Sequence, residues 1–165
     1  MRLIAMTCVL ALSSAFASAQ QPAAAPPTPD TDLTKLGYVS AADIAARFKK
    51  LPQDRADISF RIFQLPPYNV NGANRASVTQ IANTHDSQSE LFMVIDGSGS
   101  IHWGGKLTEA ARNGANETGK AIVGGTTQKL AKGDFFVVPP GLPHMFTDIA
   151  PGGLQLMQLY LPKGQ

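Results

Sequence analysis

Alternating apolar and polar residues dominate the chain from residue 58 onward. Ile58, Phe60 and Ile62 alternate with polar neighbours, which is the pattern of a strand with one buried face. Further strands are predicted at residues 76–84, 90–95, 100–103, 121–123, 126–130, 135–138 and 154–161. Many short strands separated by turns indicate an all-β sandwich or barrel.

Proline, glycine and asparagine mark the expected breaks between strands. Pro66 and Pro67 end the first strand, and an Asn- and Gly-rich stretch at residues 69–74 predicts a turn. Residues 104–120 are polar and irregular in pattern. A segment of that length without secondary structure is uncommon in a compact domain, so we expect a lid or a mobile insertion there.

A single short helix is predicted at residues 40–50, before the first strand. Ser40 is a suitable N-cap residue, and Pro52 stops the helix. The apolar residues that recur at helical spacing are Ala41, Ile44, Ala45 and Phe48. We expect this helix to pack on the barrel or to contact a second subunit.

The first 19 residues have the features of a secretory signal peptide. Arg2 is positive, residues 3–12 are apolar, and Ala17 and Ala19 give the small-x-small pattern of a cleavage site. We expect cleavage after Ala19 and a periplasmic or secreted mature protein. The alternative is a buried N-terminal helix. The apolar run is too short to span a bilayer, so no stable membrane insertion is expected.

Removing the signal peptide also removes the only cysteine, Cys8. A mature chain without a thiol has no disulfide and no thiolate metal site. Any metal would then be held by imidazole, carboxylate or amide groups. Residues 20–35 are rich in Pro and Ala and predict an extended tether, which leaves residues 36–165 as the folded domain.

Composition narrows the range of partners. A chain of 165 residues with 44% hydrophobic residues is long and apolar enough for one domain with a packed core. The net charge is only +2, and no basic cluster is visible. This argues against a nucleic-acid partner and leaves a small molecule as the expected ligand or substrate.

Two stretches, residues 83–97 and 133–148, contain two of the three histidines and a glutamate that begins an apolar strand. Side chains alternate between the faces of a strand, so Asn83 and His85 point the same way, and Glu90 opens the next strand. A Pro-Pro-Gly bend before His144 would carry its imidazole back towards the sheet that bears His85.

The two stretches resemble the paired motifs of the cupins. In the first motif, the second histidine, the glutamate and the closing glycine correspond to His85, Glu90 and Gly97. In the second motif, the matching residues are Gly133, Pro139, Gly141 and His144. Asn83 stands where the family has its first histidine, Asp148 where it has a final asparagine, and the first motif lacks its opening glycine in the expected place.

The resemblance implies a cupin-type double-stranded β-helix, or jelly-roll barrel, with the short N-terminal helix. It also implies a divalent metal ion on His85, Glu90 and His144, with Asn83 in the fourth place as a weak amide ligand or as a hydrogen-bond partner of a metal-bound water. Two imidazoles and one carboxylate suit Fe(II), and also Mn, Ni, Cu or Zn. The alternative is that His85 and His144 are structural histidines in an apolar barrel mouth.

The activity that the resemblance implies is metal-dependent oxidoreductase or dioxygenase-type chemistry on a small organic molecule. The alternative is a non-catalytic module that binds a small ligand, with or without metal. Fold analogy does not decide between them, because cupins host many activities. A homodimer is the default expectation for the family.

The third histidine, His102, is expected to lie outside the metal site. A two-residue turn at Asp96 and Gly97 would place His102 opposite Leu91 and facing away from Glu90. A one-residue bulge in that turn would reverse its direction. Remaining side chains expected in the core or the pocket wall are Phe92, Val94, Phe136, Val138 and Phe146, and Gln158 and Tyr160 are candidate polar groups of the pocket.

Overall fold

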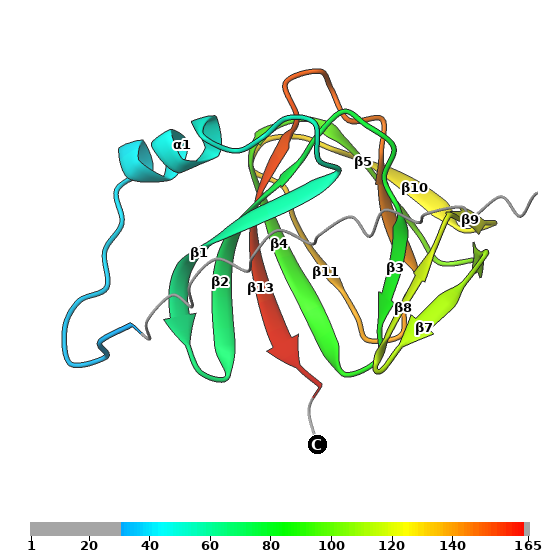
Figure 1. The fold of residues 1–165 in the computed structure, drawn as a ribbon, viewed down its shortest axis with the longest axis horizontal. Coiled ribbons are helices and arrows are strands. Elements are labelled where there is room, and N and C mark those ends of the chain that lie inside the picture. The colour runs from blue at the N-terminus through cyan, green and yellow to red at the C-terminus, as the bar shows by residue number, and fades with distance from the viewer. Residues whose placement is uncertain (1–30, 164–165) are drawn as a thin grey trace, which may run out of the picture.

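The computed structural model of the chain describes residues 31–163. The predicted signal peptide at residues 1–19 and most of the predicted tether at residues 20–35 lie outside the described residues. One short helix, α1 (Ala41–Lys49), precedes two packed antiparallel sheets (Figure 1). The all-β prediction is therefore confirmed.

The first sheet has five strands, in the spatial order β1-β2-β13-β4-β11. Their bounds are β1 (Asp57–Leu65), β2 (Tyr68–Arg75), β13 (Leu154–Pro162), β4 (Gln88–Gly97) and β11 (Phe135–Val138). All neighbouring pairs are antiparallel. The last strand of the chain thus lies between two early ones, which is the crossing connectivity of a jelly roll.

The second sheet has six strands, in the order β10-β5-β12-β3-β8-β7. Their bounds are β10 (Thr126–Leu130), β5 (Gly99–Trp103), β12 (His144–Thr147), β3 (Ala82–His85), β8 (Asn116–Gly119) and β7 (Ala111–Asn113). A separate pair joins β6 (Lys106–Thr108) to β9 (Ala121–Val123). The two motif histidines lie on the adjacent strands β3 and β12 of this sheet.

The core lies between the two sheets and is built from alternate residues of the strands. Its buried members are Ala73, Phe92, Val94, Ile101, Leu130, Val138, Phe146, Ile149, Leu154 and Leu156. The ring of Phe92 stacks on Phe136 with centroids 5.0 Å apart and meets Phe146 edge-on at 5.6 Å. Such aromatic pairs stabilise a core beyond their buried area. The predicted core residues are confirmed.

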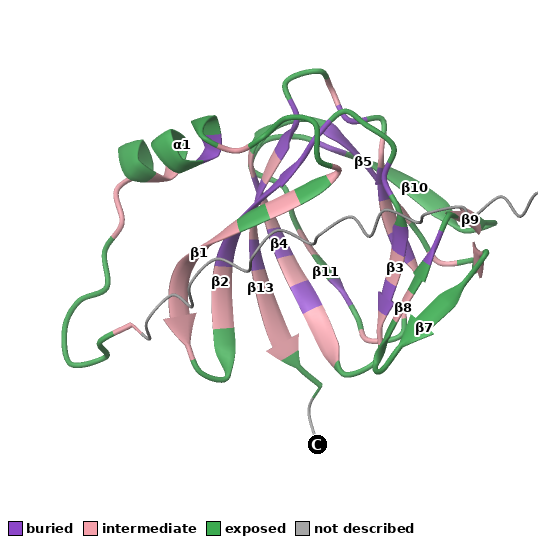
Figure 2. Ribbon diagram, in the orientation of Figure 1, coloured by how far each residue is buried: buried purple, intermediate pink, exposed green. Residues whose placement is uncertain are grey.

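Helix α1 begins where the sequence predicts. The Ser40 hydroxyl accepts a hydrogen bond from the Asp43 backbone N–H at 3.1 Å, which caps the helix. Most of α1 is exposed (Figure 2), and Phe48 is its only buried residue, packed on Phe60 with ring centroids 5.0 Å apart. Among the helices of residues 31–163, none is long and apolar enough to cross a membrane.

The prediction of a turn at residues 69–74 is wrong, because these residues belong to strand β2. Its Asn and Gly residues have low strand propensity, but β1 and β13 pair with it on both sides, and tertiary context of this kind overrides propensity. Gly72 leaves room for the ring of Phe60, which would have to move to accommodate a side chain at that position.

Two further predictions of local structure are corrected. The segment at residues 104–120 is not an irregular loop but contains β6, β7 and β8, with a β7–β8 hairpin turning at Gly114. Its side chains are largely exposed, so no apolar pattern reveals these strands. The strand predicted at residues 76–84 begins only at Ala82.

The hairpin predicted at Asp96 and Gly97 is also wrong. Strand β4 pairs with β13 and β11, whereas β5 pairs with β10 and β12 in the other sheet. Gly97 adopts a positive φ of 81°, and a side chain there would meet the Gly153 carbonyl. The chain therefore crosses from one sheet to the other at this point instead of folding back beside itself.

Candidate metal centre

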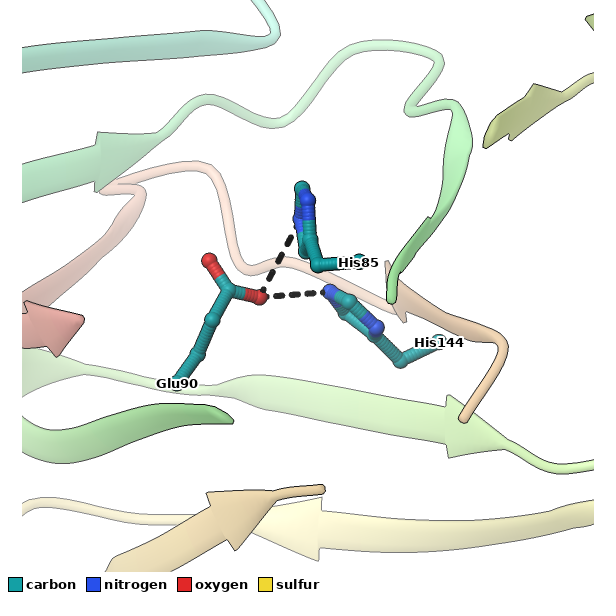
Figure 3. Close-up of side chains that lie close together, drawn as sticks. All are labelled: His85, Glu90 and His144. Carbon is teal, nitrogen blue, oxygen red and sulfur yellow. Dashed lines mark ion pairs between the residues drawn. The ribbon is translucent and has the colours of Figure 1, made fainter. Parts of the chain in front are cut away.

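Glu90 is the centre of the site. It lies on the inner face of β4, only 3% exposed. One carboxylate oxygen, Oε2, is 2.9 Å from His144 Nε2 and 3.5 Å from His85 Nε2 (Figure 3). One donor atom from each of the three residues lies within 4.8 Å of the others. The structure thus brings together the three side chains that the two motifs single out.

The two sheets supply different parts of this cluster. Strands β3 and β12 are antiparallel neighbours, with Asn83 directly opposite His144. His85 is two residues along β3 and therefore shares the face of Asn83. The two imidazole rings lie 5.7 Å apart. Glu90 comes from the opposing sheet, so the cluster joins the two layers of the fold.

In both His85 and His144, the ring nitrogen Nδ1 lies within hydrogen-bond distance of an oxygen. His144 Nδ1 is 3.1 Å from the Leu142 carbonyl oxygen, and His85 Nδ1 is 2.8 Å from Asn116 Oδ1. A carbonyl oxygen only accepts, so the Nδ1 atom of each ring carries the hydrogen. In a neutral ring, the other nitrogen, Nε2, then carries no hydrogen, and its lone pair is free on the side of Glu90. Ligand histidines in metal sites are held in this way.

The two oxygens of Glu90 have unequal partners. Oε1 accepts a hydrogen bond from Gln158 Nε2 at 2.8 Å. Oε2 is buried and has no hydrogen bond of acceptable geometry, although His144 Nε2 is close to it. A buried carboxylate oxygen without a partner is costly. A positive charge between the three side chains would give Oε2 a partner, either as a proton on an imidazole or as a metal ion.

The charge of Glu90 is maintained despite its burial. Burial opposes ionisation, but the close approach of His144, the positive charge that His85 can carry and the charge of Arg75 outweigh it, so the pKa of Glu90 lies below its ordinary value. Arg75 is itself paired with Asp57 at 2.5 Å. Glu90 is therefore anionic at neutral pH and could offer an oxygen ligand to a cation.

Tyr160 lies next to Glu90 on the adjacent strand β13. Burial, followed by the negative charge of Glu90, raises the pKa of Tyr160 to about 12. The phenol is thus neutral at physiological pH and can donate a hydrogen bond. Its ring centroid is 6.5 Å from that of His85. Both polar side chains that the sequence suggests for the pocket, Gln158 and Tyr160, lie beside the carboxylate.

Asn83 shares the face of the cluster, and its side-chain Nδ2 makes a long hydrogen bond of 3.4 Å to the Ile81 carbonyl. His102 lies outside the cluster, as expected, but for a different reason. Its Nδ1 contacts Thr127 Oγ1 and its Nε2 contacts the Gly124 carbonyl, each at 2.7 Å. Both ring nitrogens are therefore occupied elsewhere.

Asn116 contacts His85 in the site, and the sequence did not predict this contact. It lies on β8, within the segment that the sequence predicts to be irregular, and β8 pairs with β3 so that Asn116 is opposite His85. No spacing signal links two residues so far apart in the chain. Asp86, which follows His85, does not support the imidazole: its carboxylate pairs with Arg112 at 2.5 Å.

An apolar cavity of about 520 Å³ opens beside the cluster, between β11 and the strands β5 and β10. The cluster does not line it, but the two are adjacent. Val138, in the cavity wall, is the strand partner of Glu90, and Trp103, also in the wall, is the strand partner of His144. Its volume is within the range of small-molecule pockets.

Comparison with known proteins agrees with this architecture. No family model matches the chain, and no curated protein matches it. Among solved structures, the Cnp3 cupin domain of Schizosaccharomyces pombe has 11% identity and a TM-score of 0.50, over 70% of this chain and 72% of that one. The TT1209 protein of Thermus thermophilus has 12% identity and a TM-score of 0.51, over 72% of this chain and 95% of that one. The two sequence motifs, the crossing order of the strands and these likenesses together show that the chain has the fold of the cupin superfamily.

Proposed function

We propose that the protein binds one divalent metal ion through His85, Glu90 and His144. The observation that carries the proposal is the convergence of two Nε2 lone pairs and one buried carboxylate oxygen, with both Nδ1 hydrogens held by oxygens. Asn83 would complete the set as an amide ligand or by holding a bound water. The donor set suits Fe, Mn, Ni, Cu or Zn.

The activity that we propose for this centre is oxidoreductase or dioxygenase-type chemistry on a small organic molecule. A bound metal would supply a Lewis acid or an oxygen-binding centre. The protein's own groups would hold Glu90 in place through Gln158 and offer a neutral phenol from Tyr160. The adjacent apolar cavity supports a partly apolar substrate.

A non-catalytic ligand-binding role is the second candidate. One observation favours it: Glu90 is the only carboxylate in the cluster that residues 31–163 form, and it is a metal ligand in the proposed site. No separate carboxylate therefore accompanies it as a general base. In this case the metal would position a ligand in the cavity, and turnover would be absent.

Metal analysis of the purified protein tests the proposal. We expect about one equivalent of a first-row metal in the parent, and at least a tenfold lower content in His85→Ala, because one of three protein ligands is lost. The measurement is elemental analysis by mass spectrometry, with protein prepared without chelator. Val123→Ala, at an exposed position away from the site, is the control.

Absence of metal in the parent, together with no change in its thermal unfolding when each of the five metals is added, would contradict the metal-binding proposal. If iron is found, oxygen uptake in the presence of a panel of small apolar acids and aromatic compounds distinguishes the two candidate roles. Metal without oxygen uptake or any other turnover would favour the binding module.

We also propose that the protein is exported. The sequence of residues 1–19 supports this, through the positive Arg2, the apolar run and the small residues at positions 17 and 19. The expected result is a protein in the periplasmic or secreted fraction whose intact mass corresponds to a chain that starts at Gln20. A cytoplasmic protein that retains residues 1–19 would contradict this proposal and leave the metal site unaffected.

A further inference from the structure

The inner face of the five-stranded sheet has an apolar part and a polar part. Near β11 it is apolar and forms one wall of the core. Towards β1 it carries a row of polar side chains. Arg61 on β1 lies opposite Asn71 on β2, and Asn71 lies opposite Gln158 on β13. Residues that are directly opposed on neighbouring strands share a face, so all three side chains lie on the inner side of the sheet.

This polar row leads from solvent to the metal centre. At its inner end, Gln158 Nε2 donates a hydrogen bond to Glu90 Oε1 at 2.8 Å. Gln158 and Asn71 are 3% and 6% exposed, whereas Arg61 is half-buried and Ser59, two residues before it, is exposed. Neighbouring strands are about 4.8 Å apart, so the backbone of Arg61 lies about 10 Å from that of Gln158. A small molecule can span such a distance.

Arg61 has no anionic partner among residues 31–163. Its Nη1 atom is buried and makes no hydrogen bond with these residues, and none of the ion pairs that they form includes it. Arg75, another arginine on this inner face, is by contrast paired with Asp57. A buried guanidinium nitrogen without an acceptor is costly. A ligand that brings an oxygen acceptor to Arg61 would remove this cost.

The charges on this inner face favour a negatively charged ligand. The charged side chains that the register of the described strands places there are Asp57, Arg61, Arg75 and Glu90. Two of them are positive and two are negative, so they balance without a metal ion. A divalent ion held by Glu90 and two neutral imidazoles would leave an excess of positive charge. Uncompensated charge in a partly buried space is costly, and an anionic ligand lowers that cost.

We propose that Arg61 binds the carboxylate group of a small organic acid, and that this acid is the substrate or ligand of the metal centre. The planar guanidinium group matches the two oxygens of a carboxylate, and the amide of Asn71, opposite Arg61, can donate a further hydrogen bond. The role of Arg61 rests on the proposed function, because the acid would lie between Arg61 and the cluster around Glu90. It adds the chemical class of the ligand, which the apolar cavity leaves open.

Binding of acids and of their uncharged amides tests this proposal. The probes are propionate, benzoate and phenylacetate, each compared with its own amide by isothermal titration of the metal-loaded protein. We expect at least one acid to bind at least ten times more tightly than its amide. In Arg61→Gln the affinity for that acid should fall at least tenfold, because a charged hydrogen bond is lost, while the metal content stays that of the parent. Arg61→Lys keeps the charge without the planar fork and should recover part of the affinity.

Arg55→Gln is the matched control. Arg55 is exposed and precedes β1, so the same chemical change there should leave the affinity for the acid unchanged. Elemental analysis gives the metal content of each variant, and thermal unfolding shows that each variant is folded.

Three results would overturn the role of Arg61. They are the absence of any preference for acid over amide, an affinity for the acid that Arg61→Gln leaves unchanged, and tighter binding of inorganic phosphate than of every acid. If the protein took up metal but showed no such preference, only the acid site would be contradicted. If it took up no metal, the same titrations of the metal-free protein would decide. A preference for acid that depends on Arg61 would then support the acid site and contradict only the metal proposal.

Discussion

Replacing Glu90 by glutamine is expected to weaken metal binding at least about 100-fold, or about 3 kcal/mol, while the fold is retained. Glutamine keeps the shape of the side chain and an oxygen that can accept from Gln158. It removes the negative charge, which is the only one in the cluster. The measurement is isothermal titration of the metal-free protein with the metal found in the parent.

The matched control for this prediction is Glu109→Gln. Glu109 is an exposed residue that pairs with Lys120 at 3.1 Å, and exposed pairs of this kind contribute little. The same chemical change there should leave metal affinity unchanged. If Glu90→Gln bound metal as tightly as the parent did, Glu90 would not be a ligand, and the two histidines would have to bind metal without it.

Replacing Phe92 by alanine is expected to destabilise the protein by about 3–5 kcal/mol, because the ring is fully buried and its removal leaves a cavity. The ring also contacts Phe136 and Phe146. For a domain of this size, the melting temperature should fall by about 10–15 °C. Urea and thermal unfolding of the metal-free protein measure both quantities, without the added stability that bound metal supplies.

Leu36→Ala is the control for Phe92→Ala. Leu36 is 89% exposed, so its truncation removes little buried area and should change the free energy of unfolding by about 0.5 kcal/mol or less. Similar effects of the two substitutions would mean that the aromatic cluster is not the packed centre of the domain. Agreement with the prediction would show that the buried ring of Phe92 is a main contributor to the packed core.

Regular local patterns predicted much of this fold. The Ser40 cap and Pro52 located helix α1, alternation located the start of β1, and runs of strand-forming residues between turns located β4, β5, β10, β11 and β13. These elements are recognisable because strand-forming residues gather between turn residues or because a cap residue has a defined local role. The β2 strand and the β7–β8 hairpin were not predicted, because their strands form through backbone pairing that polar and small residues also allow.

The candidate site, like the fold, was predicted from the sequence only in part. Motif spacing singled out His85, Glu90 and His144, and the structure brings them within a few ångströms of one another. The contacts that orient the histidines are not apparent from the sequence. Asn116 is paired to His85 across β3 and β8, and His102 is held by β10 and the turn before it. These contacts join residues more than 20 positions apart.

The sequence by itself indicated the core residues of the strands that it predicted and singled out the three side chains that we propose as metal ligands, because alternation and motif spacing are local properties of the chain. Only the tertiary structure decided which strands are neighbours. Every residue other than proline offers the same backbone donor and acceptor, so pairing between distant strands leaves little local signal. That pairing is what places Asn116 beside His85 and Gln158 beside Glu90.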